Sequence, residues 1–476
     1  MLFNSIEFLV FLPITFVLYW FMLNKDLRLQ NLLVVVASYI FYGWWDWRFL
    51  SLIFISSAVD YSIGRKLASV TKPKARKYLL WLSLALNLGF LGVFKYFNFF
   101  VDSLKDAFHI FGADIELTTL NIVLPVGISF YTFQTLSYTI DVYKGNLKPS
   151  DDPVEFFAFV SFFPQLVAGP IERATNLLGQ FSEPRVFDYH KAKDGVRQII
   201  WGFFKKIAIA DTCAVFVNDI FGSYADQSSG MLLLGAFYFA FQIYGDFSGY
   251  SDIAIGTAKL FGFDLMTNFR YPYFSRDIAE FWRRWHISLS TWFRDYLYIP
   301  LGGSRGGRSS AVRNTFIIFI VSGFWHGANW TFIVWGALNA IYFLPLLLSN
   351  RNRRNLDNVA NGSLWPSFGE VRQIIVTFLL TLLAWVFFRS PDISNSFEYL
   401  RILVFSGSWL VEFSYLSSVP MILIMVGLEW IQREKTHPMQ IEKLSSIARL
   451  SVYCLIVFLT IAHVSSTNQE FIYFQF

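Results

Sequence analysis

Long apolar segments recur from one end of this chain to the other, and they constrain its fold more than any other feature. A helix needs about 20 apolar residues to cross the hydrocarbon core of a bilayer. Segments of roughly this length or longer lie near residues 3–23, 29–44, 48–64, 78–101, 121–140, 154–170, 197–222, 230–260, 313–348, 372–389, 399–430 and 447–465. Because these runs are continuous rather than alternating, they predict an all-α polytopic integral membrane protein with about 11–13 transmembrane or re-entrant helices.

The composition agrees with a chain that a lipid bilayer surrounds. Hydrophobic residues make up 55% and charged residues 15% of the 476 positions, and a soluble domain could not cover that much apolar surface. Because apolar segments continue throughout, we expect a single membrane-embedded domain over residues 1–476. Cys213 and Cys454 lie far apart and form no CxxC motif, so neither a disulfide framework nor a thiolate metal site is expected. The modest net charge of +5 gives no reason to expect a nucleic-acid partner.

Charged residues in the loops predict the orientation of the chain. The densest short basic run consists of Arg65, Lys66, Lys72, Lys74, Arg76 and Lys77, and the positive-inside rule places it in the cytoplasm. Counting back through three segments puts the N-terminus outside. The next loop, 102–120, is mainly acidic, as an outward-facing loop can be. The most polar stretch, 350–370, is predicted to be a surface loop.

Residues 278–297 differ from the other segments because they are amphipathic. Trp and other apolar residues recur there at three- and four-residue spacing, while Arg283, Arg284 and Arg294 lie elsewhere around the helix. This pattern predicts a helix that lies at the membrane interface, on the cytoplasmic side because a loop with Arg305 follows it. The loop at 302–306 could offer backbone amides and arginines to phosphates, or it could be a plain positive-inside loop.

His326 is an ionisable residue inside an otherwise strongly apolar stretch, within the string SGFWHGANW at 322–330. Such a residue is costly in a membrane and marks a functional site by default. Gly323 and Gly327 would let a substrate or another backbone approach it closely. The alternative is a small-residue packing site with a histidine bonded across helices. The residues alone leave both open.

His286 lies 40 positions before His326 in the string WRRWHIS. Two histidines near one cavity could bind a metal, but the sequence has no HxxxH spacing and no nearby Cys here, so no metal site is predicted. His463, a lone polar residue of the last apolar segment, is expected to be a structural, hydrogen-bonded histidine.

Two other apolar segments contain polar residues. Asp246 and Asp252 lie in the string at 242–252, together with glycines and serines, and we expect the helix to be interrupted there. The two acids could form a proton relay or an ion site, or they could satisfy backbone groups at the break. Residues 163–173 form a second interruption, in which Glu172 and Arg173 could pair.

Six strings, in order along the chain, resemble the membrane-bound O-acyltransferase family, and within it the bacterial branch that acts in alginate O-acetylation. They lie at 96–99, 124–130, 163–173, 242–252, 283–303 and 322–330. The resemblance implies helices ringed around a central tunnel in a bacterial inner membrane. It also implies that His326 is the catalytic histidine, and that His286 occupies a position where other branches carry Asn or Asp.

The resemblance further implies a reaction. We expect a cytosolic acyl thioester, by analogy acetyl-CoA, to donate its acyl group, with its phosphates near Arg283, Arg284, Arg294 and Arg305. His326 would take the proton of the acceptor hydroxyl, and His286 would orient a substrate or stabilise charge. The expected acceptor is alginate or another extracytoplasmic glycan, reached with a periplasmic O-acetyltransferase partner. No permanently bound cofactor is expected.

Two other classes of function remain as alternatives. A transporter or flippase could use Asp246, Asp252, Lys95 and His326 as an ion or substrate path. No inverted repeat of the kind common in transporters is visible, and the basic amphipathic segment has no evident use in transport. A non-catalytic scaffold would tolerate the loss of His326.

Overall fold

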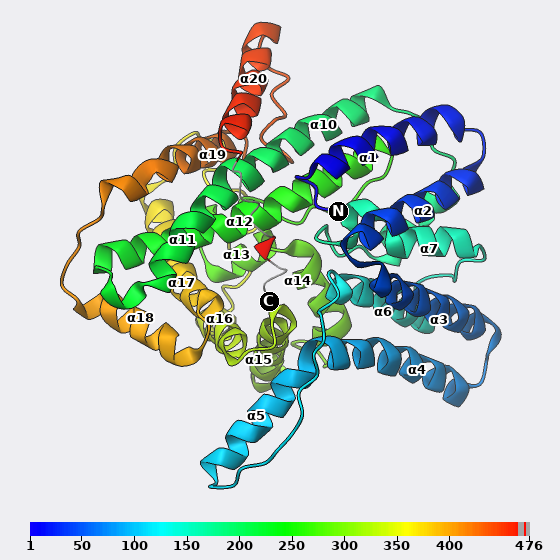
Figure 1. Ribbon diagram of the computed structural model, residues 1–476, viewed down its shortest axis with the longest axis horizontal. Helices are drawn as coiled ribbons and strands as arrows, with labels where there is room; N and C mark the ends of the chain where they lie inside the picture. Colours follow the sequence, from blue (N-terminus) through cyan, green and yellow to red (C-terminus); the bar gives the residue numbers. More distant parts are fainter. Residues whose placement is uncertain (465–470, 473–476) are drawn as a thin grey trace. The chain divides into compact units, whose positions relative to one another are not determined.

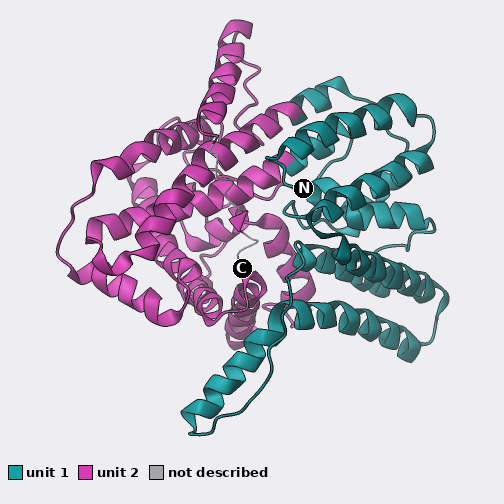
Figure 2. Ribbon diagram, in the orientation of Figure 1, with its two compact units in different colours: residues 1–195, 254–266 teal, residues 196–253, 267–476 magenta. Residues whose placement is uncertain are grey.

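Helices make up most of the protein in the computed structural model, which describes residues 1–464 and 471–472 (Figure 1). No strand occurs in these residues, so the predicted all-α class is confirmed. The chain divides into two compact units (Figure 2). Unit 1 comprises Met1–Gly195 and Ala254–Met266, and unit 2 comprises Val196–Ile253 and Thr267–Phe476.

Unit 1 contains the first nine helices. They are α1 (Ile6–Val17, continued by a π-helical turn over Leu18–Met22), α2 (Leu27–Asp46), α3 (Leu50–Ser69), α4 (Pro73–Leu91), α5 (Phe97–Ile110), α6 (Ile128–Lys144), α7 (Pro153–Ser161), α8 (Phe163–Leu166) and α9 (Ala174–Ser182). The predicted helices at 3–23, 29–44 and 48–64 are confirmed. The predicted crossing at 154–170 is wrong, because two short helices replace it. Pro164 has no N–H to continue the hydrogen bonding of α7.

A buried polar network joins α3, α4 and α6 inside unit 1. The carboxylate of Asp60 is fully buried and accepts hydrogen bonds from Asn87 Nδ2 at 2.7 Å and Thr139 Oγ1 at 3.0 Å. Ser83 Oγ donates to the same carboxylate at 2.5 Å. A buried carboxylate is tolerated when several donors surround it, so this network fixes how the three helices pack.

Unit 2 contains the later helices, and α10 (Tyr189–Phe203) and α12 contribute residues to both units. After α10 come a π-helix over Phe204–Asp211, α11 (Thr212–Gly222), α12 (Ser229–Leu260), α13 (Ile278–Arg284), α14 (Ile287–Phe293), a π-helix over Arg294–Tyr298, α15 (Gly307–His326), α16 (Trp330–Leu348), α17 (Phe368–Arg389), α18 (Ile393–Phe405), α19 (Val419–Ile431) and α20 (Ser446–Ala462).

The predicted interruption at 242–252 is wrong, because α12 continues through it for 32 residues. Its two carboxylates pair with lysines of the π-helix instead. Lys206 Nζ lies 2.8 Å from Asp246 and Lys205 Nζ lies 2.6 Å from Asp252. Gly249 permits this approach, since a Cβ there would come within 2.8 Å of a carbonyl oxygen of α10. The acids are therefore neutralised without a break in the helix.

Three other predicted segments are corrected by breaks in the chain. Residues 313–348 form the hairpin α15–α16, because Gly327 is extended and the Asn329 side chain caps α16 by accepting from Thr331 N at 3.0 Å. Residues 399–430 divide into α18 and α19. The amphipathic segment 278–297 breaks at His286, between α13 and α14.

Five helical segments of the described chain are long and apolar enough to cross a membrane. They are Pro73–Ile110, Ser229–Leu260, Trp330–Leu348, Phe368–Arg389 and Phe413–Ile431. Their length and hydropathy agree with a polytopic membrane protein. The total number of crossings and their arrangement around a tunnel stay predictions.

Candidate active site

His326 is the last residue of α15, and aromatic side chains surround it. It is buried, with an exposed fraction of 3%. The centres of the Trp335 and Phe388 rings lie 5.2 and 5.4 Å from the centre of its imidazole, and the ring of its neighbour Trp325 lies 5.0 Å away. Helices α15, α16 and α17 thus place an ionisable side chain in an apolar environment, as the sequence predicts.

His286 lies beside His326, although 40 positions separate them in sequence. Their ring centres are 6.4 Å apart. His286 precedes α14 with φ 42° and ψ 55°, a left-handed conformation that a non-glycine residue adopts at a cost. The break between α13 and α14 therefore turns this imidazole toward the histidine of α15. The predicted pair of histidines is brought together.

Asn268 fixes the orientation of the His286 ring. Its Oδ1 lies 3.1 Å from His286 Nδ1 and accepts a hydrogen bond from Ser288 Oγ at 2.9 Å. The backbone N–H of Ser288 also donates to this Oδ1 at 3.3 Å, which fixes the orientation of the amide, and Nδ2 donates to Ser251 Oγ at 3.1 Å. With the amide oxygen accepting, Nδ1 carries the proton and Nε2 carries the lone pair. Sequence reasoning missed Asn268, because no motif marks the irregular stretch that contains it.

Burial sets the charge of His286, which lies outside the five long apolar segments. The side chain is 1% exposed, and desolvation lowers its pKa to about 3. It is neutral at physiological pH. A neutral imidazole in this tautomer can accept a hydrogen bond at Nε2, but it offers no positive charge.

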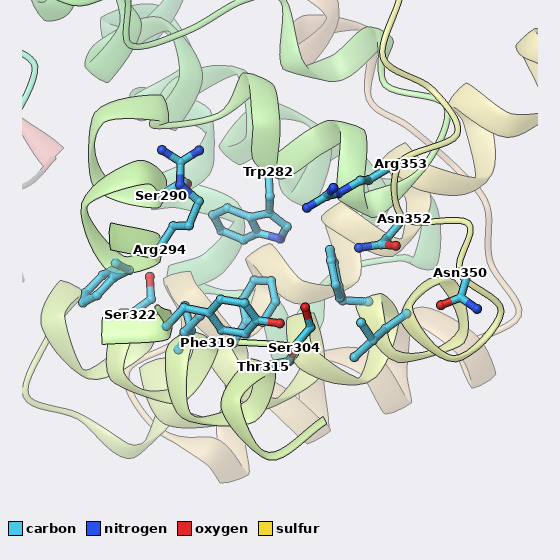
Figure 3. A pocket seen from close by; sticks show the side chains of 15 residues that line it. Trp282, Ser290, Arg294, Ser304, Thr315, Phe319, Ser322, Asn350, Asn352 and Arg353 are labelled. Carbon is cyan, nitrogen blue, oxygen red and sulfur yellow. The ribbon is translucent and has the colours of Figure 1, made fainter. Parts of the chain in front are cut away.

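A cavity of about 510 Å³, here called the large cavity, is lined in part by residues of α15 (Figure 3). Ser322, one helical turn before His326, lines it. Its centre is apolar and aromatic, and two arginines reach it from different segments. Its lining residues are Trp282, Ser290, Phe293, Arg294, Tyr298, Ser304, Thr315, Ile318, Phe319, Ser322, Phe343, Leu347, Asn350, Asn352 and Arg353.

A second cavity of about 370 Å³, here called the small cavity, begins just beyond His326 in the chain. Two of its lining residues, Phe332 and Phe388, belong to the aromatic cluster near His326. Its lining residues are Ala328, Asn329, Thr331, Phe332, Phe388, Arg389, Ser390 and Pro391. In the sequence, His326 therefore lies between Ser322, the last α15 residue that lines the large cavity, and Ala328, the first residue that lines the small cavity.

The four arginines predicted to bind phosphate have different surroundings. Arg294 lines the large cavity and pairs with Asp295 at 2.7 Å. Arg283 donates to the carbonyls of Asn352 and Asn355, at 2.8 and 2.6 Å. Neither Arg283 nor Arg284 lines the large cavity, and Arg305 is exposed in the loop before α15.

The loop after α16 supplies the groups that sequence reasoning missed. Asn352 and Arg353 line the large cavity, whereas the stretch 350–370 was predicted to be a plain surface loop. The basic cluster Arg351, Arg353 and Arg354 at the end of an apolar segment is the signal that could have found them.

Arginines on and before α13 hold this loop against the rest of unit 2. Arg276 lies 3.1 Å from Glu280 and 2.9 Å from Asp357 of the loop, and Arg284 lies 2.9 Å from the same glutamate. Glu280 is 1% exposed, so two guanidinium groups balance its buried charge. Arg284 also donates to the Asp357 carbonyl at 3.1 Å, so it helps to hold the loop, and Arg283 holds the cavity wall directly through Asn352.

In the part of the chain that the structure describes, no group of three or more His, Cys, Asp or Glu side chains could hold a metal ion.

Comparison with known proteins gives consistent matches. The family model for membrane-bound O-acyltransferases matches residues 146–357, which include both histidines. A protein of Pseudomonas putida named as a probable alginate O-acetylase is 38% identical over the whole of both chains. One of the same name from Pseudomonas syringae is 41% identical over 86% of this chain and 76% of its own. The peptidoglycan O-acetyltransferase of Helicobacter pylori is 32% identical over all of this chain and 98% of its own.

Proposed function

Since this chain belongs to the membrane-bound O-acyltransferase family and is a multi-pass membrane O-acyltransferase, we propose that it serves the O-acetylation of a cell-envelope polysaccharide. In this proposal it transfers an acetyl group from a cytosolic thioester to an acceptor hydroxyl. The names of its relatives support the acetyl group and the envelope glycan. The observation that carries the proposal is the buried His326, which lies along the chain between two cavities.

In the proposed reaction His326 is the general base. Its neutral imidazole accepts the proton of the acceptor hydroxyl while that oxygen bonds to the acyl carbon of the thioester. The C–S bond then breaks, and the leaving thiolate receives the proton. Proton transfer by a positioned side chain contributes roughly 10²–10⁴ to a rate. The surrounding Trp and Phe rings exclude water, which would otherwise compete as an acceptor.

His286 is proposed to orient the acceptor next to the reacting hydroxyl. Its low pKa argues against a positively charged residue that stabilises an oxyanion. Its Nδ1 hydrogen-bonds Asn268 Oδ1, and in this tautomer Nε2 is a hydrogen-bond acceptor. The reacting hydroxyl has one proton, which His326 takes, so His286 would hold the acceptor through another of its hydroxyls. The ring centres of the two histidines are 6.4 Å apart.

The large cavity is proposed to hold the donor, for which acetyl-CoA is the chemical candidate. A volume of about 510 Å³ and a mixed aromatic and polar wall suit a pantetheine arm. Arg294 and Arg353 would meet the phosphates of the donor, with Arg283 and Arg284 acting through the loop that they hold. Arg305 remains a candidate from its basic loop alone. The thioester would then approach His326 past Ser322.

The proposed location is a bacterial inner membrane with the N-terminus in the periplasm. The basic loops at 65–77 and 351–354 support cytoplasmic positions for both, because Lys and Arg are enriched on that side. The acetyl group would leave on the opposite side, to a periplasmic O-acetyltransferase partner or directly to alginate or a related glycan. A transporter is less well supported, since Lys206 and Lys205 pair with Asp246 and Asp252.

Vectorial transfer tests this proposal. The purified protein is placed in sealed liposomes, and radiolabelled acetyl-CoA is supplied on one side while an acceptor glycan, with periplasmic extract from the source organism, is supplied on the other. We expect labelled glycan only when the donor is on the side of the loops 65–77 and 351–354. Label that appears equally for both donor orientations, or that remains as acetyl-CoA carried intact across the membrane, would contradict the proposal.

A further inference from the structure

The small cavity contains one charged side chain, Arg389, at the end of α17. Its guanidinium donates to Asn218 Oδ1 at 2.9 Å and lies over the Phe221 ring at 5.5 Å. Among the described residues no carboxylate lies within ion-pairing distance of it. A guanidinium has five N–H donors. A partly buried cation with one neutral hydrogen-bond partner has both charge and donors available for an anion.

Two other polar side chains of this cavity, those of Asn329 and Ser390, are hydrogen-bonded within the protein. Asn329 donates to the Pro391 carbonyl at 2.8 Å and accepts from Thr331 N at 3.0 Å. Ser390 donates to the Val386 carbonyl at 2.8 Å. Arg389 is the charged group of this cavity, and the ligand that suits it carries an oxyanion.

The cavity lies at the end of α15 that is opposite to the basic loops. Helix α15 begins after the loop with Arg305 and ends at His326, and α16 runs back to the arginines at 351–354. Phe388 joins the cavity to the site, because it lines the cavity and its ring centre is 5.4 Å from that of His326. In the proposed reaction this is the side from which an acceptor reaches the base.

We propose that Arg389 and the small cavity form an acceptor subsite that binds an oxyanion near the hydroxyl to be acylated, the carboxylate of an acidic sugar in particular. The subsite rests on the function proposed above. It makes the enzyme selective for glycans that carry a carboxylate, because the guanidinium pairs with a carboxylate through two parallel hydrogen bonds. A neutral glycan leaves the cation without a counter-ion.

Binding of matched oligosaccharides tests this subsite without requiring acyl transfer. The full chain in nanodiscs of neutral phosphatidylcholine is titrated with a uronic-acid oligosaccharide and with the same oligosaccharide after its carboxylates are reduced to alcohols. We expect the charged form to bind about tenfold more tightly or better, as charge-assisted hydrogen bonds do. We expect Arg389→Gln to remove the preference and Arg389→Lys to retain part of it.

Two controls make the result specific. Arg401→Gln changes an exposed arginine of α18 that pairs with Glu398, and the preference should be unchanged. His326→Ala should also leave it unchanged, so a failed catalytic role and a failed subsite are distinguishable. Equal binding of the two sugars by the wild type, or a preference that survives in Arg389→Gln, would overturn the subsite. Loss of the preference when anionic phosphatidylglycerol is added to the nanodiscs would also overturn the subsite, since a lipid headgroup would then be the anion that Arg389 binds.

Discussion

His286 has a buried, neutral imidazole, and its titration links the site to stability. Its pKa of about 3 in the folded chain lies below the value of about 6.5 that an exposed imidazole has. The unfolded chain therefore binds one more proton between these values, and stability is lost as the pH falls through this range. Because of this residue alone, the free energy of unfolding is about 2 kcal/mol lower at pH 5 than at pH 7.

This prediction is checked by thermal unfolding in detergent between pH 7 and pH 4. We expect the apparent Tm of His286→Gln to fall less with acidification than that of the wild type, while His463→Gln follows the wild type. His463 is the matched control, because its Nδ1 bonds the Leu459 carbonyl at 2.8 Å at the end of α20. Parallel curves for wild type and His286→Gln would show that His286 is not buried and neutral.

At the level of single residues, the sequence predicts the two histidines of the site but not the residues that contact them or line the large cavity. His326 is recognisable because an ionisable residue stands in an apolar run, and His286 because it lies in a string shared with a family. Asn268 could not be predicted, since an Asn in a polar stretch is common and only folding brings it to His286. Arg353 lines the large cavity, and its only signal in the sequence is the basic cluster at 351–354.

Buried ion pairs hold α12 against the π-helix over Phe204–Asp211. Lys206 lies 2.8 Å from both Asp211 and Asp246 and is 1% exposed. We expect Lys206→Met to lower stability by about 3–5 kcal/mol, because it leaves buried carboxylates without a cation. Lys193→Met, at a residue of α10 outside this cluster, is the control. Loss of thermal stability no greater than in the control would show that the pairs contribute nothing net.

The loop after α16 is an element whose position depends on α13. Arg283 holds the carbonyls of Asn352 and Asn355, and Asn352 lines the large cavity. We expect Arg283→Ala to raise KM for acetyl-CoA about tenfold with little change in kcat, because it loosens the cavity wall and leaves the histidines in place. Arg401→Ala should change neither constant. A loss confined to kcat would contradict a role in donor binding.

Element boundaries were predictable where an apolar run is uniform and wrong where a contact distant in sequence decides them. Helices α2 and α17 agree with their predicted segments. The break expected near Asp246 is absent, because its cation comes from Lys206, forty positions earlier. The break at His286 went unpredicted because the apolar spacing of 278–297 continues through it.

At the scale of the whole molecule, composition and apolar periodicity were enough to predict an all-α membrane protein, since lipid allows few other solutions. The ordered strings added the family. The two cavities, whose lining residues precede and follow His326 along the chain, were not predictable, because a cavity depends on how several helices pack and not on any one segment. In the proposed reaction the large cavity holds the donor and the small cavity holds the acceptor.

The central claim is that His326 is the base of acyl transfer, and its most direct test compares His326→Ala with His463→Ala. Both variants are purified, shown to be folded by their unfolding curves, and assayed for transfer of labelled acetyl from acetyl-CoA. We predict a loss of about 10²–10⁴ in the rate for His326→Ala and an unchanged rate for His463→Ala. A folded His326→Ala that transfers acetyl at the wild-type rate would contradict the account.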